Sequence, residues 1–454
     1  MNTRMLCALL VPFLVVIAFS QEPVPAVDRQ VGDDPDSSAI AQIIEEGTKH
    51  SQVMEILSYI ADVYGPRLTW SPAYKRAAEW AKNKLTSLGL ANAHIEGWEP
   101  LGRGWEIRQY SANVIGAQVF PLLSHPKAWS PGVDATGDVI LMDAKTDSAL
   151  DTYKGKLKGK YVLLGTARDV ELKTDPAISR LTDAQLLELA NADIARPRRR
   201  RRFESSPDQR KRAMLEYRKM EMLHSEGALA ILTAGGFDGG SIMVLSASVP
   251  SHPDTTRATR PSVWSPKAPK ILPQIAVGVE HYNRMVRMLQ KREKLKIDMQ
   301  LDVAFSKEDS GYNVIAEIPG TDLKDEIVMI GAHLDSWHGG TGATDDGTGV
   351  SVCMEAMRIL KATGFKPQRT IRIGLWGGEE QGLFGSRAYV KKYLGERPTQ
   401  RNDSVEVKTS YKPGAEKFSV YFNDDNGTGK FRGIYMERNE AVRPIFRKWF
   451  APFG

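Results

Sequence analysis

Residues 327–337 read IVMIGAHLDSW, an apolar run that ends in a histidine and an aspartate. A second apolar run, Thr370–Trp376, precedes the acidic pair Glu379–Glu380. Runs with so few polar interruptions are typical of strands buried on both faces of a parallel sheet. Apolar residues at helical spacing follow the two runs, over 347–363 and 383–394. The order strand, loop, helix therefore occurs twice, and it predicts an α/β fold with a mixed, largely parallel sheet flanked by helices.

Acidic and imidazole side chains gather where the predicted strands end, including a third strand over 418–422. They are His333, Asp335, Asp345, Glu379, Glu380, Asp424 and Asp425. In open α/β sheets, ligands bind beyond the carboxyl ends of the strands. Imidazole and carboxylate groups suit Zn²⁺, and a carboxylate has two oxygens with which to bridge two metal ions. The sequence therefore predicts a metal site at this edge of the sheet.

The spacing of these residues suggests two further roles beside the metal ligands. Because side chains alternate along an extended segment, His333 and Asp335 share one side, where the Asp335 carboxylate can accept the second ring N–H and orient the imidazole. Glu379 and Glu380 point in different directions, so one can bind metal while its neighbour acts as a base toward water.

Three motifs in combination resemble the di-zinc exopeptidases of the aminopeptidase and carboxypeptidase Q group. The motifs are HLDSW at 333–337, GATDDGTG at 342–349 and GEEQG at 378–382. The turn GPRL at 65–68 is similar to the N-terminal part of the same group. Residues 159–164 and 226–228 are similar to the protease-associated domain inserted in that group. The resemblance implies the zinc exopeptidase fold with a β-rich protease-associated insertion.

Carried over by position, the resemblance implies two zinc ions in the complete protein. His333 and Asp425 would hold one ion and Glu380 the other, with Asp345 bridging the two. We expect Asp425 rather than its neighbour Asp424 because the ligand of this group lies just before the pattern x-Gly-Thr.

The resemblance also implies the reaction, with Glu379 as general base and Asp335 as the residue that orients the imidazole. The leading interpretation is an exported zinc exopeptidase that removes a terminal residue from peptides or dipeptides; the end of the peptide that it reads stays open. Glutaminyl cyclisation on a single zinc is an alternative within enzymes. A non-catalytic receptor or scaffold, like relatives that resemble transferrin receptor, is an alternative outside them.

Two features depart from the pattern of this group. The chain between Glu380 and Asp425 is longer than usual, and we expect a surface insertion around Pro398–Pro413. The group's fifth metal ligand is a late histidine, yet no histidine follows His338 before the last residue, Gly454. A chain truncated at its C-terminus is the expected explanation, and His338 is the side chain that could otherwise fill the vacancy.

The expected segments are a signal peptide at 1–20, the N-terminal part of the catalytic domain at 21–112, the inserted domain at 113–302 and the metal-binding core at 303–454. The apolar stretch Leu6–Phe19 is too short to span a bilayer and precedes small residues that suit signal-peptidase cleavage after Ser20. We therefore expect export. Helical spacing predicts helices over 40–64 and 72–88.

The net charge of +6 comes from one short segment. The chain has 61 Lys and Arg against 55 Asp and Glu, and Arg196–Arg202 contains six arginines, so the remainder is balanced. No aromatic ladder accompanies the run, and we interpret it as a solvated segment rather than a nucleic-acid site. A mean hydropathy of −0.33 excludes a multi-span membrane protein. The expected partners are peptides, and a homodimer is an option that the sequence leaves open; we expect no nucleic acid and no stable membrane insertion.

Overall fold

The computed structural model describes residues 36–172, 174–176, 178–192, 206–237, 239–255, 259–396, 409–425, 429 and 431–453. The expected signal peptide and the arginine run lie outside these residues, as does most of the insertion expected at Pro398–Pro413. Within the described residues, we find no helix with the length and apolar character needed to cross a membrane.

The chain divides into two units, of which the smaller contains Met1–Thr48, Asp175–Arg201 and Thr428–Gly454. Its helical elements are α1 (Ser37–Lys49), which ends at the unit boundary, α5 (Asp183–Asn191), η4 (Glu440–Val442), α10 (Arg443–Phe450) and η5 (Ala451–Phe453). Arg447 of α10 donates to the Asn191 side-chain oxygen at 2.7 Å, which links α10 to α5.

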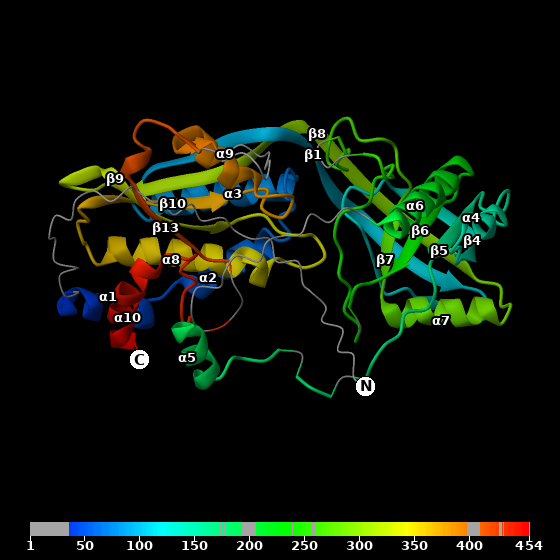
Figure 1. Ribbon diagram of the computed structural model, residues 1–454, viewed down its shortest axis with the longest axis horizontal. Coiled ribbons are helices and arrows are strands. Elements are labelled where there is room, and N and C mark those ends of the chain that lie inside the picture. Colours follow the sequence, from blue (N-terminus) through cyan, green and yellow to red (C-terminus); the bar gives the residue numbers. More distant parts are fainter. Residues whose placement is uncertain are drawn as a thin grey trace. The chain divides into compact units, whose positions relative to one another are not determined.

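The larger unit, Lys49–Thr174 and Arg202–Gly427, contains a sheet of 11 strands in the order β13-β9-β10-β8-β4-β5-β6-β7-β3, with β1 paired to β8 and β2 (Figure 1). The strands are β1 (Ala91–Ile115), β2 (Phe120–Pro121), β3 (Ser124–Pro126), β4 (Val133–Met142), β5 (Lys160–Leu164), β6 (Ala230–Ala234), β7 (Gln274–Val277), β8 (Lys296–Ile318), β9 (Leu323–His333), β10 (Arg369–Trp376) and β13 (Phe418–Asn423). A separate small ladder pairs β11 (Gly395–Glu396) with β12 (Ser410–Tyr411).

Helices flank the sheet of the larger unit. They are α2 (Val53–Ser58), the π-helical turn η1 (Tyr59–Val63), α3 (Pro72–Ser87), α4 (Asp147–Asp151), α6 (Pro207–Ser225), α7 (Val279–Gln290), η2 (Ala343–Gly347), α8 (Thr348–Ala362), α9 (Phe384–Tyr393) and η3 (Ala415–Lys417). The helix α3 begins where its sequence predicts, because the Ser71 side chain accepts the Tyr74 N–H and Pro72 occupies the first turn.

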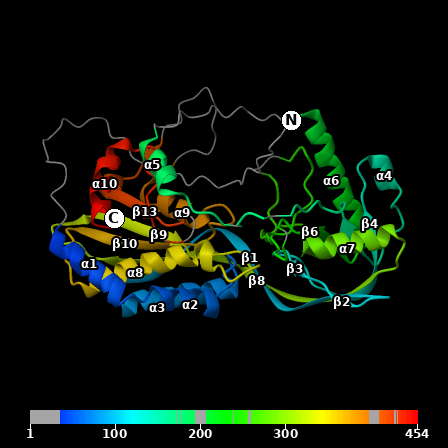
Figure 2. The ribbon, with the colours of Figure 1, turned by 90° about the horizontal axis from the view of Figure 1, so that it is seen from below.

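Alternating side chains give the sheet two apolar faces at β8, β9 and β10. Val314 and Ala316 of β8 pack with Ile373 of β10 against helices α2, α3 and α8. The intervening Ile315 joins Trp376 on the opposite face, which α9 covers (Figure 2). Burial on both faces is the reason that these strands read as nearly continuous apolar runs.

Two long strands connect this part of the sheet to the rest. β1 and β8 pair antiparallel from Ala91↔Glu317 to Ile115↔Lys296, with register shifts along the way. β8 also pairs with β10 near its C-terminal end and with β4 near its N-terminal end. Hydrogen bonding is therefore continuous across residues 112–113 and 302–303, where the sequence suggested domain boundaries.

The single helix expected over 40–64 is wrong, because the chain leaves helical geometry between α1 and α2. At this break the Gln52 N–H donates to the Glu355 carboxylate of α8 at 3.0 Å. A contact from a residue 303 positions away thus replaces the local helical bond. The other expected elements at 72–88, 327–332, 347–363, 370–376, 383–394 and 418–422 are confirmed within one to four residues at their ends.

We expect Met354→Ala to lower the free energy of unfolding by about 2–5 kcal/mol, since the Met354 side chain is fully buried between α8 and the sheet. Val352→Ala, on the 36 % exposed side of the same helix, should change it by no more than about 0.5 kcal/mol. Urea unfolding of the two variants measures the difference. Equal midpoints would show that α8 does not pack as described.

Candidate metal centre

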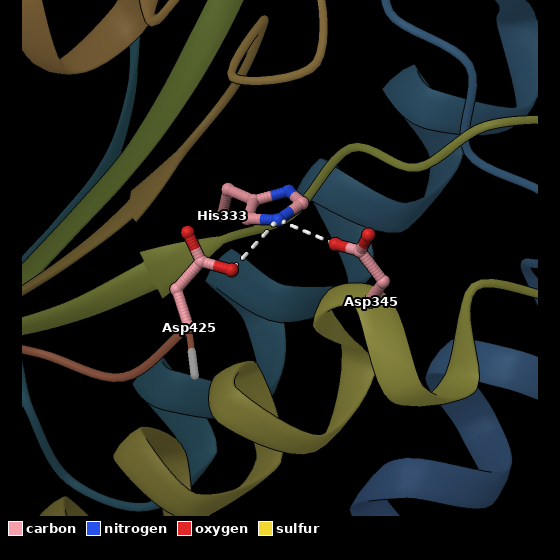
Figure 3. Close-up of side chains that lie close together, drawn as sticks. All are labelled: His333, Asp345 and Asp425. Atoms are coloured by element: carbon pink, nitrogen blue, oxygen red, sulfur yellow. Dashed lines mark hydrogen bonds and ion pairs between the residues drawn. The ribbon is translucent and has the colours of Figure 1, made fainter. Parts of the chain in front are cut away.

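His333, the last residue of β9, faces two carboxylates from separate segments, Asp345 of η2 and Asp425 after β13 (Figure 3). Its Nε2 lies 2.9 Å from Asp345 Oδ1 and 3.6 Å from Asp425 Oδ1. One ligand atom from each of the three residues lies within 4.8 Å of the others. The His333 side chain is 2 % exposed, whereas that of Asp345 is 67 % exposed, so the group opens to solvent on the Asp345 side.

Parallel strand pairing brings these residues to one edge of the sheet. β9 lies between β13 and β10, and His333 is level with Trp376 at the end of β10. The Asp424 N–H donates to the Gly331 carbonyl oxygen at 3.0 Å, which continues the β13–β9 ladder up to Asp425. The strand ends therefore bring the segments that carry Glu379–Glu380, His333 and Asp425 to one edge of the sheet.

The hydrogen bonds of His333 determine which ring nitrogen is available. Nδ1 lies 2.9 Å from the main-chain oxygen of Asp335, which can only accept, so Nδ1 carries the proton and donates it. In the neutral ring, Nε2 then presents a lone pair toward the oxygens of Asp345 and Asp425, which are also acceptors. Acceptors that face one another require a proton or a metal ion between them. The donor set, one imidazole nitrogen and two carboxylates, suits zinc.

Asp335 orients the imidazole through its main chain, not through the carboxylate that we expected to accept the ring N–H. The carboxylate oxygen lies 3.7 Å from Nδ1. The carboxylate instead accepts the Glu379 backbone N–H at Oδ1, at 3.1 Å, and the Thr69 hydroxyl and the Glu380 backbone N–H at Oδ2, at 2.8 and 3.3 Å. The fully buried Asp335 thus ties the end of β9 to the acidic loop after β10.

The concentration of negative charge perturbs the pKa values around His333. Burial alone would lower the pKa of His333, but its contacts with Asp335, Asp345 and Asp425 hold it well above 6.5. Burial, followed by repulsion from neighbouring carboxylates, raises the pKa of Glu379 to about 7 and that of Glu380 to about 9. The site therefore retains protons wherever no metal cation compensates its charge.

Asp346 is a buried residue of the site to which the sequence analysis assigned no role. Its carboxylate accepts two backbone N–H groups, that of His333 at 3.2 Å and that of Gly349, in the first turn of α8, at 3.0 Å. Burial raises its pKa to about 8. A Cβ atom on Gly349 would lie 2.4 Å from both Asp346 Oδ1 and the Asp424 carbonyl oxygen, so only glycine permits this approach. An Asp just before a helix start is a capping signal that could have identified the residue.

Glu380 and His338 are not among the residues whose ligand atoms meet within 4.8 Å in the described part of the chain. Glu380 remains in the neighbourhood, because its backbone N–H donates to Asp335 and its pKa responds to Asp345. His338 is buried against Trp105, and its Nε2 lies 2.7 Å from the Pro126 carbonyl oxygen. The expected replacement of a late histidine by His338 receives no support from this position.

Known proteins are similar to this chain in sequence and in fold. Residues 313–435 match the sequence profile of peptidase family M28. Carboxypeptidase Q of Mus musculus is 23% identical over 430 residues, covering 94% of this chain and 76% of that protein. Leupeptin-inactivating enzyme 1 of Streptomyces exfoliatus is 42% identical over 148 residues, 32% of this chain and 29% of that protein.

A crystal structure of a peptidase M28 precursor from Shewanella amazonensis SB2B covers 86% of this chain and 74% of that chain, at 22% sequence identity and a TM-score of 0.51. This similarity confirms the expected fold class, a mixed α/β sheet flanked by helices. The family profile and the curated relatives confirm the expected resemblance to the exopeptidase group.

We expect the metal-free protein to lose stability as the pH rises from about 5.5 to 8.5. The folded-state pKa values of Glu379, Glu380 and Asp346 lie above their ordinary values, so in this window the folded state holds more protons than the unfolded state. Each extra proton lowers the free energy of unfolding by about 1.4 kcal/mol per pH unit.

Urea midpoints measured with a chelator across this range test the expectation. Glu380→Gln should flatten the decline, because an amide cannot titrate, and zinc added at the alkaline end should restore stability to the unmodified chain. A midpoint that rises with pH would contradict the crowding of carboxylates described here.

Proposed function

Because residues 313–435 match the profile of peptidase family M28, we propose that the chain is a member of that family and a zinc-dependent exopeptidase that hydrolyses the terminal peptide bond of peptides or dipeptides. The observation that carries this proposal is the set of mutually facing acceptors at His333 Nε2, Asp345 and Asp425. A structural role alone does not explain why such a set sits at the solvent-facing edge of a sheet.

Two zinc ions would use the acidic residues in different ways. His333 and Asp425 would hold one ion, Glu380 would hold the other, and the exposed Asp345 would bridge them. When bound, zinc supplies Lewis acidity toward the scissile carbonyl and makes water acidic enough to be deprotonated near neutral pH. The raised pKa of Glu380 is consistent with this role. Ionising this carboxylate without a cation is unfavourable, so a bound cation would stabilise its charged form strongly.

Glu379 would act as the general base. Its carboxyl group is partly buried, and the charges of His333, Asp345 and Asp425 influence its pKa, which supports a role near the proposed ligands. A pKa of about 7 is close to the value that favours both uptake and release of a proton at neutral pH. Glu379 takes a proton from the attacking water and passes it to the leaving amine, so hydrolysis yields one carboxylate and one free amine.

Asp335 would support this step without touching the substrate. Its carboxylate accepts the backbone N–H groups of both Glu379 and Glu380, and these hydrogen bonds would fix the position of the main chain that carries the base. Its main-chain oxygen holds the His333 ring at the same time. A single buried residue thus couples the position of the base to that of the metal ligand.

We also propose export and the segment assignment 1–20, 21–112, 113–302 and 303–454, with a protease-associated insertion in the third segment. The similarity to carboxypeptidase Q over 94% of the chain supports peptides or dipeptides as substrates. Activity of the purified chain on a panel of dipeptides and amino-terminal or carboxyl-terminal blocked peptides tests the proposal, because only an exopeptidase requires one free end.

We expect Glu379→Gln to lower turnover by about 10² to 10⁴-fold while zinc content stays nearly unchanged, since the amide keeps the shape but cannot accept a proton. Rate measurements and metal analysis on the same preparation check both parts. Glu416→Gln, on the exposed turn η3, serves as the matched control. Turnover within a few-fold of the unmodified chain would remove Glu379 from the base role.

Asp345→Asn should weaken both metal ions together, because a neutral amide is a poor bridge between two cations. Chelator competition should show the loss, and turnover should fall at least as far as in the Glu379 variant. Asp322→Asn, at an exposed position, provides the control. Two tightly held zinc ions in Asp345→Asn would contradict the bridging assignment.

A further inference from the structure

Arg67 is fully buried in the turn between η1 and α3. Arginine is almost never fully buried unless its donors are paired, because removing the charge from water is costly. The hydrogen-bond partners of this side chain therefore indicate its role.

The guanidinium group donates four hydrogen bonds, all to main-chain carbonyl oxygens. Nε donates to Leu334 at 2.6 Å. Nη1 donates to both Ile60 and Thr341 at 3.0 Å, and Nη2 donates to Gly342 at 2.9 Å. The planar fork thus spans three separate stretches of chain, which a single-point cation cannot do.

Two of these stretches carry the proposed metal ligands. Leu334 lies directly between His333 and Asp335, at the end of β9. Thr341 and Gly342 lie just before Asp345, in the loop that leads into α8. The guanidinium therefore bridges the two segments whose separation determines the 2.9 Å approach of His333 Nε2 to Asp345.

The backbone of the same turn reinforces this connection. The Arg67 N–H donates to the Ser336 hydroxyl at 3.0 Å, and the Ser336 N–H donates back to the Arg67 carbonyl oxygen at 3.1 Å. Two residues on, the Thr69 hydroxyl donates to the Asp335 carboxylate at 2.8 Å. The turn that contains Arg67 and Thr69 is therefore hydrogen-bonded to each of the residues 334–336, which follow His333.

We propose that Arg67 is a positioning residue for metal binding, which holds the segments 333–336 and 341–345 at the separation that lets His333 and Asp345 share one cation. This inference rests on the proposed function. Because Arg67 is fully buried, it cannot contact a peptide, and it acts only through the ligands that it places.

The charge of Arg67 serves the same purpose. Burial lowers its pKa to about 10, and Asp335, Asp346 and Asp345 oppose that decrease. The group therefore stays cationic at neutral pH, within the electrostatic influence of these carboxylates. A permanent positive charge at this place limits repulsion among the carboxylates before the metal arrives, so the ligands are already arranged when it binds.

Arg67→Lys is the variant that tests the proposal. Lysine keeps the charge but presents its donors from one point, so it cannot reach carbonyls in all three stretches. We expect the apparent dissociation constant for zinc, measured by chelator competition, to rise at least tenfold. The visible absorption spectrum of the cobalt-substituted protein should also change, and turnover should recover in excess zinc, because the defect lies in populating the binding geometry.

Arg358→Lys is the matched control. Arg358 is a second buried arginine of the larger unit, 6 % exposed, and pairs with Glu355 on α8 away from the metal loops. We expect this variant to lose thermal stability yet to keep the zinc affinity and the cobalt spectrum. A lower zinc affinity in Arg67→Lys alone supports the positioning role. An equal loss of zinc affinity in both variants overturns the proposal and indicates a general effect on stability.

Further outcomes decide the remaining cases. Unchanged zinc affinity and cobalt spectrum in folded Arg67→Lys overturn the proposal. If Arg67→Lys does not unfold cooperatively, Ser336→Ala replaces it as the test, because it removes the hydroxyl that accepts the Arg67 N–H. A weaker zinc affinity in Ser336→Ala supports the proposal, and an unchanged affinity overturns it. An unmodified chain that binds zinc but hydrolyses no peptide contradicts the proposed function and leaves the positioning test intact. A chain that binds no zinc contradicts both.

Discussion

Negative charge crowded at the carboxyl ends of β9, β10 and β13 is the constraint on which the rest of the structure depends. At its centre, His333 Nε2 and the oxygens of Asp345 and Asp425 face one another as acceptors. Burial and the neighbouring negative charges raise the pKa values of Glu379, Glu380 and Asp346, so these groups favour their protonated forms when no cation is bound. Such crowding costs stability in the absence of a cation, and this cost is the reason that we propose a metal site here.

The fold tolerates this charge because the carboxylates lie where strands end, and because backbone N–H groups and the Thr69 hydroxyl satisfy the buried Asp335 and Asp346. The β13-β9-β10 order brings three loops together at one edge, while apolar side chains fill both faces of the same strands. The long strands β1 and β8 then carry the hydrogen-bonded sheet onward to β4 and its neighbours. The metal edge and the remaining strands of the larger unit are therefore parts of one continuous framework.

Many of the hydrogen bonds that position the site residues involve main-chain atoms. The oxygen of Asp335 orients the imidazole, the amides of Glu379 and Glu380 are held by the Asp335 carboxylate, and Arg67 fastens carbonyl groups of the two ligand-bearing segments. Such contacts depend on backbone position rather than on the identity of each side chain. They also explain how loops, which are usually the mobile part of a fold, hold ligands within a few ångströms of one another.

The sequence by itself determined the strands around 327–332 and 370–376, the helices that follow them, and the residue types at their ends, because periodicity and ligand chemistry are local properties of the chain. The tertiary structure alone decided the break between α1 and α2, where Glu355 captures an amide 303 positions away, and the main-chain route by which Asp335 holds His333. It also revealed Arg67, which in the sequence is merely part of a turn. These features depend on atoms that meet only after folding, and no local spacing records which distant carbonyl a buried donor will reach.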